Sequence, residues 1–165
     1  MNPNKRTDGT IQGLREFYGR NFQEYSPGKV YEPFYERSGG CTCANPIIIG
    51  YIKTGKLAWM EQWIEVCQCE TGKWGWACTT ASDSCEGHNN ASGSSFCFVH
   101  IPHPNYTSYY CYDSAEDAIK GAIAHISKNL DERGDRDNKG TRKMLALALS
   151  QLKPKAPEVI QLSLF

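Results

Sequence analysis

The sequence lacks an excess of charge of either sign. Eighteen lysine and arginine residues balance eighteen aspartate and glutamate residues, so no global field draws the molecule onto nucleic acid or an anionic membrane. Long hydrophobic runs are missing too. No stretch approaches the ~20 apolar residues of a membrane span, and the polar segment Met1 to Gly13 lacks the apolar core of a signal peptide. We therefore expect a soluble protein that is not exported, has no membrane partner and contacts DNA, if at all, through a local surface.

The common catalytic motifs are also absent. The chain contains no phosphate-binding loop, no Gly-x-Gly-x-x-Gly fingerprint, no His-Glu-x-x-His helix and no Gly-x-Ser-x-Gly elbow. Their absence favours a non-enzymatic role. An enzyme whose catalytic residues carry no local signature remains the alternative.

The pattern of apolar residues and turn signals predicts an α+β fold, with an antiparallel sheet of about five strands covered by one or two C-terminal helices. We expect a short helix within Thr10 to Phe22, and a polar loop from Ser82 to Ser94. Strands are expected at residues 46–53, 57–69, 74–78, 95–101 and 108–112.

Two helices are predicted after the strands. Ser114 is a good N-cap with Asp117 three residues on, and an apolar stripe follows at helical spacing to Leu130. Thr141 is expected to cap a second helix that ends near Leu152. Residues 1–152 should therefore form one domain, cysteine-rich in 41–111, and residues 153–165 an extended tail.

Cysteine is over-represented, with eight in the chain. In a reducing cytosol such enrichment points to metal binding or buried thiols rather than to disulfides. A hairpin turning about Gly55 would set Cys43 opposite Cys67 and Cys41 opposite Cys69, so that four sulfurs converge on one face. Four thiolates are the ligands that a structural zinc ion prefers. Ordinary buried thiols are the alternative.

A second candidate zinc site combines Cys85, His88, Cys97 and His100, in two Cys-x-x-His pairs. This set is weaker, because Cys97 and His100 would point to opposite faces of a regular strand. The even cysteine count and two glycosylation acceptor patterns also keep a secreted, disulfide-bonded protein as an alternative, which the lack of a signal peptide disfavours.

The composition changes beyond Leu152. Pro154 and Pro157 oppose helix formation and favour an extended tether. The five residues that end the sequence are Gln161, Leu162, Ser163, Leu164 and Phe165. They resemble, at every position, the Gln-Leu-Ser/Asp-Leu-Phe peptide of proteins that bind the bacterial DNA sliding clamp. The resemblance implies that Gln161 hydrogen-bonds at the mouth of a pocket on the clamp, while the two leucines and Phe165 fill its apolar subsites.

This resemblance implies a clamp-binding accessory protein of DNA replication or repair, in the cytoplasm of a bacterium or a phage-infected host, which competes with other clamp clients. Two alternatives stay open: a clamp-targeted DNA-processing or DNA-modifying enzyme, and a zinc-stabilised adaptor that recruits another protein. Five basic residues near the tail are candidates for phosphate contacts with DNA close to the clamp: Arg133, Arg136, Lys139, Arg142 and Lys143. Nearby acidic residues dilute this charge, so a solvated helix and loop are the alternative interpretation.

Overall fold

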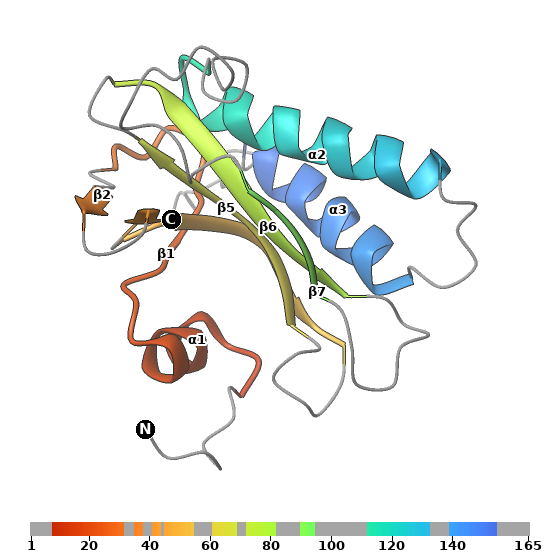
Figure 1. Cartoon of the computed structure of the whole chain (residues 1–165), viewed down its shortest axis with the longest axis horizontal. Coiled ribbons are helices and arrows are strands. Elements are labelled where there is room, and N and C mark those ends of the chain that lie inside the picture. The colour runs from red at the N-terminus through yellow and green to blue at the C-terminus, as the bar shows by residue number, and fades with distance from the viewer. Residues whose placement is uncertain are drawn as a thin grey trace, which may run out of the picture.

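The computed structural model describes residues 8–31, 35–37, 41–43, 45–54, 61–68, 72–81, 90–94, 112–132 and 139–154. Five strands of this part form one mixed sheet (Figure 1). In spatial order they are β1 (Gln23–Glu24), β4 (Ile47–Lys53), β5 (Glu61–Gln68), β6 (Trp74–Ala81) and β7 (Asn90–Ser94). The pairing is antiparallel from β4 to β7, whereas β1 runs parallel to β4. A separate two-stranded sheet joins β2 (Tyr35–Arg37) to β3 (Cys41–Cys43).

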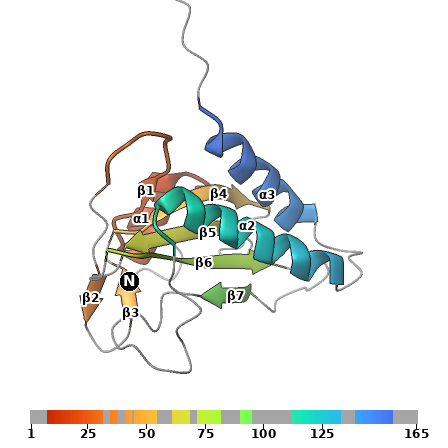
Figure 2. The same ribbon diagram turned by 90° about the horizontal axis from the view of Figure 1, so that it is seen from above.

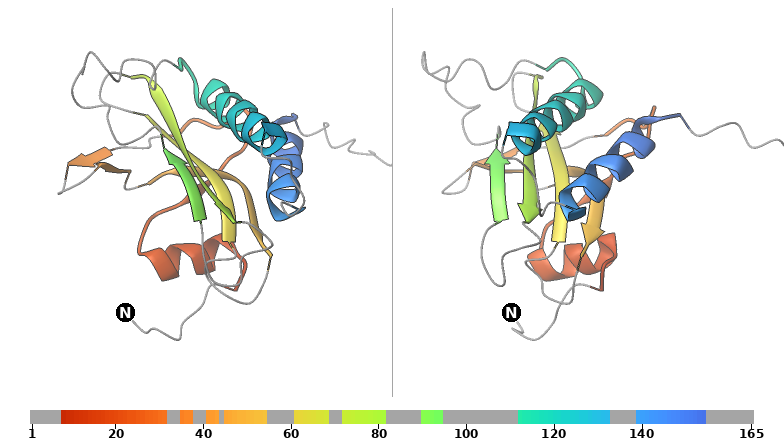
Figure 3. Two further views of the ribbon diagram at one scale, coloured as in Figure 1. Left: turned by 45° about the vertical axis from the view of Figure 1, so that its right-hand side comes forward. Right: turned by 90° about the vertical axis from the view of Figure 1, so that its right-hand side faces the viewer.

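Two helices cover one face of the five-stranded sheet. They are α2 (Ala115–Glu132), which packs on β5 and β6, and α3 (Lys139–Leu152), which packs mainly on β4 (Figure 2). The helix α1 (Ile11–Tyr18) lies against the opposite face (Figure 3). The predicted α+β class, with helices on an antiparallel sheet, is therefore confirmed; the parallel strand β1 was not predicted.

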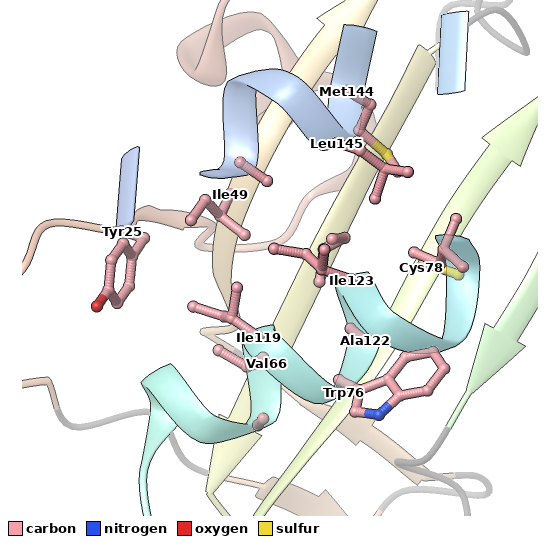
Figure 4. Packing of buried hydrophobic residues seen from close by; sticks show 14 of the residues in the cluster. Tyr25, Ile49, Val66, Trp76, Cys78, Ile119, Ala122, Ile123, Met144 and Leu145 are labelled. Atoms are coloured by element: carbon pink, nitrogen blue, oxygen red, sulfur yellow. The ribbon is translucent and has the colours of Figure 1, made fainter. Parts of the chain in front are cut away.

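The isoleucine run of β4 explains why both faces are covered. Side chains alternate across a strand, so Ile47 and Ile49 join the core under α2 and α3, while Ile48 packs on the α1 side. All three are at most 1% exposed. The larger core between the sheet and the two helices interleaves side chains from all three elements, among them Val66, Ile119 and Met144 (Figure 4).

The start of α2 follows the predicted capping pattern. The backbone N–H of Asp117 donates to the Ser114 hydroxyl at 3.0 Å, and that hydroxyl donates to the Asp117 carboxylate at 2.7 Å. The expected cap of the next helix is wrong, since α3 begins at Lys139 and Thr141 lies inside it. Thr141 is 2% exposed, and its hydroxyl donates to the Gln62 side chain on β5 at 2.8 Å. A buried tertiary partner has replaced the local one.

The predicted strands agree with the observed strands β4, β5 and β6, but differ from the structure after β6. The segment expected to be a polar loop, Ser82 to Ser94, contains β7, whose Ser92 pairs with Thr79 of β6. The strands expected at 95–101 and 108–112 lie outside the described residues except for Tyr112, which forms a single bridge to Trp74. Trp63, Trp74 and Trp76 are each at most 9% exposed. They serve as core residues, so their rings are not available to stack on nucleic-acid bases.

Candidate functional site

Helix α3 is the element from which the C-terminal tail departs, and its end is fixed firmly to the sheet. The Gln151 side chain accepts a hydrogen bond from the backbone N–H of Gly50 at 2.8 Å. At Gly50 the φ angle is +69°, and the β4–β5 register shifts between Ile49 and Ile52, as in a β-bulge. The bulge exposes this N–H to Gln151 instead of to β5. Lys153 and Pro154, which follow Leu152 at the end of the helix, are exposed, so the tail starts at the surface.

The close packing of α3 on β4 depends on the missing side chain of Gly50. A Cβ atom added there would lie 2.7 Å from the Met144 carbonyl oxygen and 3.0 Å from the Ala148 Cβ. Glycine is therefore required both for its backbone conformation and for the approach of the helix. This contact holds α3 at the β4 side of the sheet.

The outward face of α3 is a single stripe of exposed residues, which we call the α3 strip. It consists of Lys139, Arg142, Lys143, Ala146, Leu149, Ser150 and Lys153. Their spacing of three and four residues places them along one side of the helix, opposite the buried Met144, Leu145 and Ala148. Four of the seven are basic, and α3 contains no acidic residue.

The strip runs against the usual charge preference of a helix. Lys139, Arg142 and Lys143 lie near the N-terminal end of α3, where the helix dipole favours acidic side chains, and its last turn has no basic residue. Each basic residue in the first turn is unfavourable by about 0.3–1 kcal/mol at low ionic strength. Local helix stability therefore does not account for this arrangement.

Helix α2 shows the balanced pattern that is usual for a solvated face. Its exposed Glu116 and Asp117 offset its exposed Lys120 and Lys128. Lys120 also forms an ion pair with Glu116 one turn away, at 2.6 Å. The contrast with the α3 strip shows that the charge of the outer surface is unevenly distributed between two neighbouring helices.

A polar groove with a volume of about 770 Å³ adjoins the end of α3. Segments around α1 and β1 form one wall, with Arg15, Glu24 and Lys29, and the last turn of α3 forms the other. Arg15 also serves the fold, because its Nε donates to the Phe22 carbonyl oxygen at 2.6 Å. The described lining contains neither histidine nor cysteine, so it offers no nucleophile paired with an imidazole base.

Glu61 is a buried acidic residue on β5 whose carboxyl pKa is raised. Burial raises the pKa of Glu61, and the Lys53 ammonium group, 3.6 Å away, opposes this effect. Glu61 is 1% exposed and lines neither the groove nor a smaller cavity of about 240 Å³ beside Gly50. Because no substrate can reach it through either cavity, we assign it no catalytic role.

A second buried carboxylate fastens α1 to the sheet. The Arg20 guanidinium group donates to both oxygens of Glu65, at 3.2 and 3.3 Å, and the Trp63 indole N–H donates to one of them at 3.2 Å. Arg20 also lies over the Phe22 ring, 4.8 Å from its centroid. These groups satisfy one another in a packed aromatic cluster, which indicates a structural role.

The assumed pairing of the cysteine-bearing strands is wrong. Ile47 pairs with Val66, so Cys67 directly follows the end of this ladder while Cys43 lies four residues before it. Strand β3, which carries Cys41 and Cys43, pairs instead with β2. Cys67 is disulfide-bonded in this structure. The register assumed for the cluster Cys41, Cys43, Cys67 and Cys69 is therefore wrong, while zinc binding by these cysteines stays a prediction.

The other metal predictions are not tested by the described residues. Cys69, Cys85, His88, Cys97 and His100 lie outside them. Within the described part of the chain, no three histidine, cysteine, aspartate or glutamate side chains form a group suited to a metal ion. Zinc binding stays a prediction that metal analysis of the purified protein would test.

The structure brings together three of the five basic residues proposed to contact DNA. Lys139, Arg142 and Lys143 share the α3 strip, whereas Arg133 and Arg136 lie outside the described residues, as does the whole peptide 161–165. Lys153, a further basic residue near the tail, joins them on the strip at helical spacing. Sequence analysis missed the groove, which depends on long-range packing and has no local signal.

Comparisons of the chain with protein-family models, curated proteins and solved structures find no match. Among the described residues, no helix combines the length and apolar character needed to cross a lipid bilayer. The functional argument therefore depends on the residues of this chain alone.

Proposed function

We propose that this protein is a sliding-clamp-binding accessory protein of bacterial, phage or plasmid DNA replication or repair. One observation carries the proposal: residues 161–165 match the clamp-binding peptide at all its positions. From average residue usage, such a match at a given position arises by chance on the order of once in 10⁵ to 10⁶ chains.

The position of the peptide in the molecule supports the proposal. It is separated from α3 by eight residues that include Pro157, a length and composition typical of an extended tether. The tether begins beside the exposed Lys153, just beyond the Gln151–Gly50 hydrogen bond. The described core is assembled from residues between Ile11 and Leu152.

The expected strength of docking follows from the apolar area that the peptide can bury. Placing Leu162, Leu164 and Phe165 in apolar subsites contributes roughly 5–8 kcal/mol before costs. Ordering the tail and losing rigid-body freedom offset part of this, so we expect an affinity of about 1 μM. Binding of this strength is exchangeable and allows competition with other clients for the shared pocket.

Fluorescence polarisation against a purified bacterial sliding clamp tests the proposal. The labelled full chain is titrated with clamp and compared with a truncation after Ala156 and with the variants Gln161→Ala and Phe165→Ala. Ser163→Asp is the matched control, because the clamp-binding pattern accepts either residue at that position. An unlabelled pentapeptide of the same pattern serves as competitor.

We expect the full chain and Ser163→Asp to bind, the truncation to lose binding, and the two alanine variants to bind at least ten-fold more weakly, since each removes about 1.5–3 kcal/mol of apolar or hydrogen-bonding contact. Equal binding by the full chain and the truncation would overturn the assignment of the tail. Failure of the pentapeptide to compete would show that the chain binds elsewhere on the clamp.

A further inference from the structure

The α3 strip combines positive charge, length and an exposed location along one side of a helix. Its four basic residues are exposed, its polar member Ser150 is uncharged, and its opposite side already fills the core. The fourteen residues of α3 extend over roughly 21 Å. A linear array of cations on this scale matches a linear polyanion better than it matches a compact anionic ligand.

We propose that the α3 strip contacts the phosphate backbone of duplex DNA while the tail is docked on the clamp. This inference rests on the proposed function for its choice of partner, because a sliding clamp encircles duplex DNA. The eight residues between Leu152 and Gln161 span at most about 30 Å. Docking of the tail therefore confines the strip to the neighbourhood of the DNA that the clamp surrounds.

The composition of the strip favours duplex DNA over a membrane. Insertion into a lipid interface requires a broad apolar face with large side chains, whereas the apolar members of the strip are Ala146 and Leu149 alone. The strip also lacks asparagine and glutamine, and arginine occurs once, so it carries few of the side chains that read base edges. It is suited to contacts that hold and orient the protein independently of sequence.

Neutral overall charge makes such a contact weak in the absence of clamp docking. With eighteen charges of each sign, the chain receives no general attraction to DNA. A few phosphate contacts give weak, salt-dependent binding by themselves, and tethering raises the effective concentration of DNA at the strip. We therefore infer a second contact that acts after recruitment and orients the domain on the duplex.

The double variant Lys139→Glu/Lys143→Glu tests this proposal without weakening the helix. Both residues are exposed near the N-terminal end of α3, where glutamate is more favourable than lysine, so the melting temperature should be unchanged or higher. Lys120→Glu/Lys128→Glu on α2 is the control, because it makes the same change of net charge on a surface of mixed charge.

Binding of each full-length protein to a labelled 30-base-pair duplex of mixed sequence is measured by polarisation between 50 and 200 mM salt. Four phosphate contacts predict that wild-type affinity falls about a hundred-fold over this range, and two contacts predict about ten-fold. We expect the α3 variant to show the shallower slope and the α2 variant to follow the wild type. Equal weakening by both variants, or by neither, would overturn the proposal.

Two further measurements separate this inference from the proposed function. Binding to free clamp without DNA should be the same for the wild type and both double variants; absence of wild-type binding there would refute clamp docking alone. Anionic phosphatidylserine vesicles are the third probe. Stronger α3-dependent binding to vesicles than to duplex would overturn the assignment of DNA, and the opposite order supports it.

Discussion

Replacing Gly50 by alanine is the most direct test of how α3 is held on the sheet. The substitution adds one methyl group at a β-bulge where φ is +69° and where the Met144 carbonyl oxygen lies 2.7 Å from the new Cβ position. Real Cβ atoms do not approach a backbone oxygen so closely. Either the helix moves away from β4 or the strand changes its conformation.

The loss of stability can be estimated from two separate effects. A left-handed conformation is unfavourable for alanine by about 1–2 kcal/mol, and overpacking a close contact typically adds about 1–3 kcal/mol. Gly28→Ala isolates the first effect, because Gly28 has φ of +75° and no atom within 4 Å of its Cβ position. We therefore expect losses of about 1–2 kcal/mol for Gly28→Ala and about 2–5 kcal/mol for Gly50→Ala.

Urea unfolding followed by circular dichroism measures both values, and thermal unfolding should show a decrease of about 2–4 °C per kcal/mol for a chain of this size. The difference between the two variants reports the contact between β4 and α3. If Gly50→Ala is no less stable than Gly28→Ala, the close packing of α3 against the bulge is wrong, and so is the fixed starting point assigned to the tail.

Three other predictions concern the buried polar groups and the disulfide. Because the pKa of Glu61 is raised in the folded state, the wild type loses stability as the pH rises above the ordinary glutamate value of 4.5 and through the raised pKa; Glu61→Gln should flatten this decline in urea unfolding series, and an unchanged slope would contradict the assignment. Thr141→Val leaves the buried Gln62 side chain without its hydroxyl partner and should lower the free energy of unfolding by about 1–3 kcal/mol, whereas a neutral effect would show that this hydrogen bond is replaced. In protein purified under oxidising conditions, Cys67 should resist alkylation after denaturation until a reductant is added; mass spectrometry showing immediate alkylation would exclude the disulfide.

The helices were predictable because their signals are local. The reciprocal hydrogen bonds of Ser114 and Asp117 involve residues three apart, and the stripe that follows them is visible in the sequence as a periodic pattern. The start of α3 was harder to predict. Thr141 resembles an N-cap in the sequence, but its hydroxyl donates a hydrogen bond to Gln62, 79 positions away. A side chain that can cap a helix can equally satisfy a buried partner, and only the tertiary structure decides between them.

The edge strands and the cysteine pairing were not predictable for a related reason. The residues of β7, from Asn90 to Ser94, have little intrinsic preference for strands and adopt one because β6 provides the ladder. The expected cysteine cluster depended on where a hairpin turns. A displacement of a few residues is enough to move Cys67 away from Cys43, because strand register changes the partner and the face of every side chain.

The candidate site divides in the same way. The peptide at 161–165 and the basic residues of α3 are features of the sequence, and they were predicted from it. The anchoring of the last turn of α3, which fixes where the tail begins, could not be predicted, because it depends on a hydrogen bond between Gln151 and Gly50, 101 positions apart in the chain. That hydrogen bond holds the last turn of α3 on the sheet, while the buried Met144, Leu145 and Ala148 set which side of the helix faces solvent.

The bulge at Gly50 therefore anchors the last turn of α3, from which the C-terminal tail departs. With the last turn of α3 held on the sheet, the length of the proposed tether becomes the main variable that sets the distance between the domain and the proposed partner of residues 161–165. Inserting flexible residues after Pro154 would enlarge the volume available to the peptide, and the effective concentration of a partner bound there would fall roughly as the −3/2 power of the total tether length. The conformation of Gly50 thus fixes the helix end from which the proposed tether of eight residues departs.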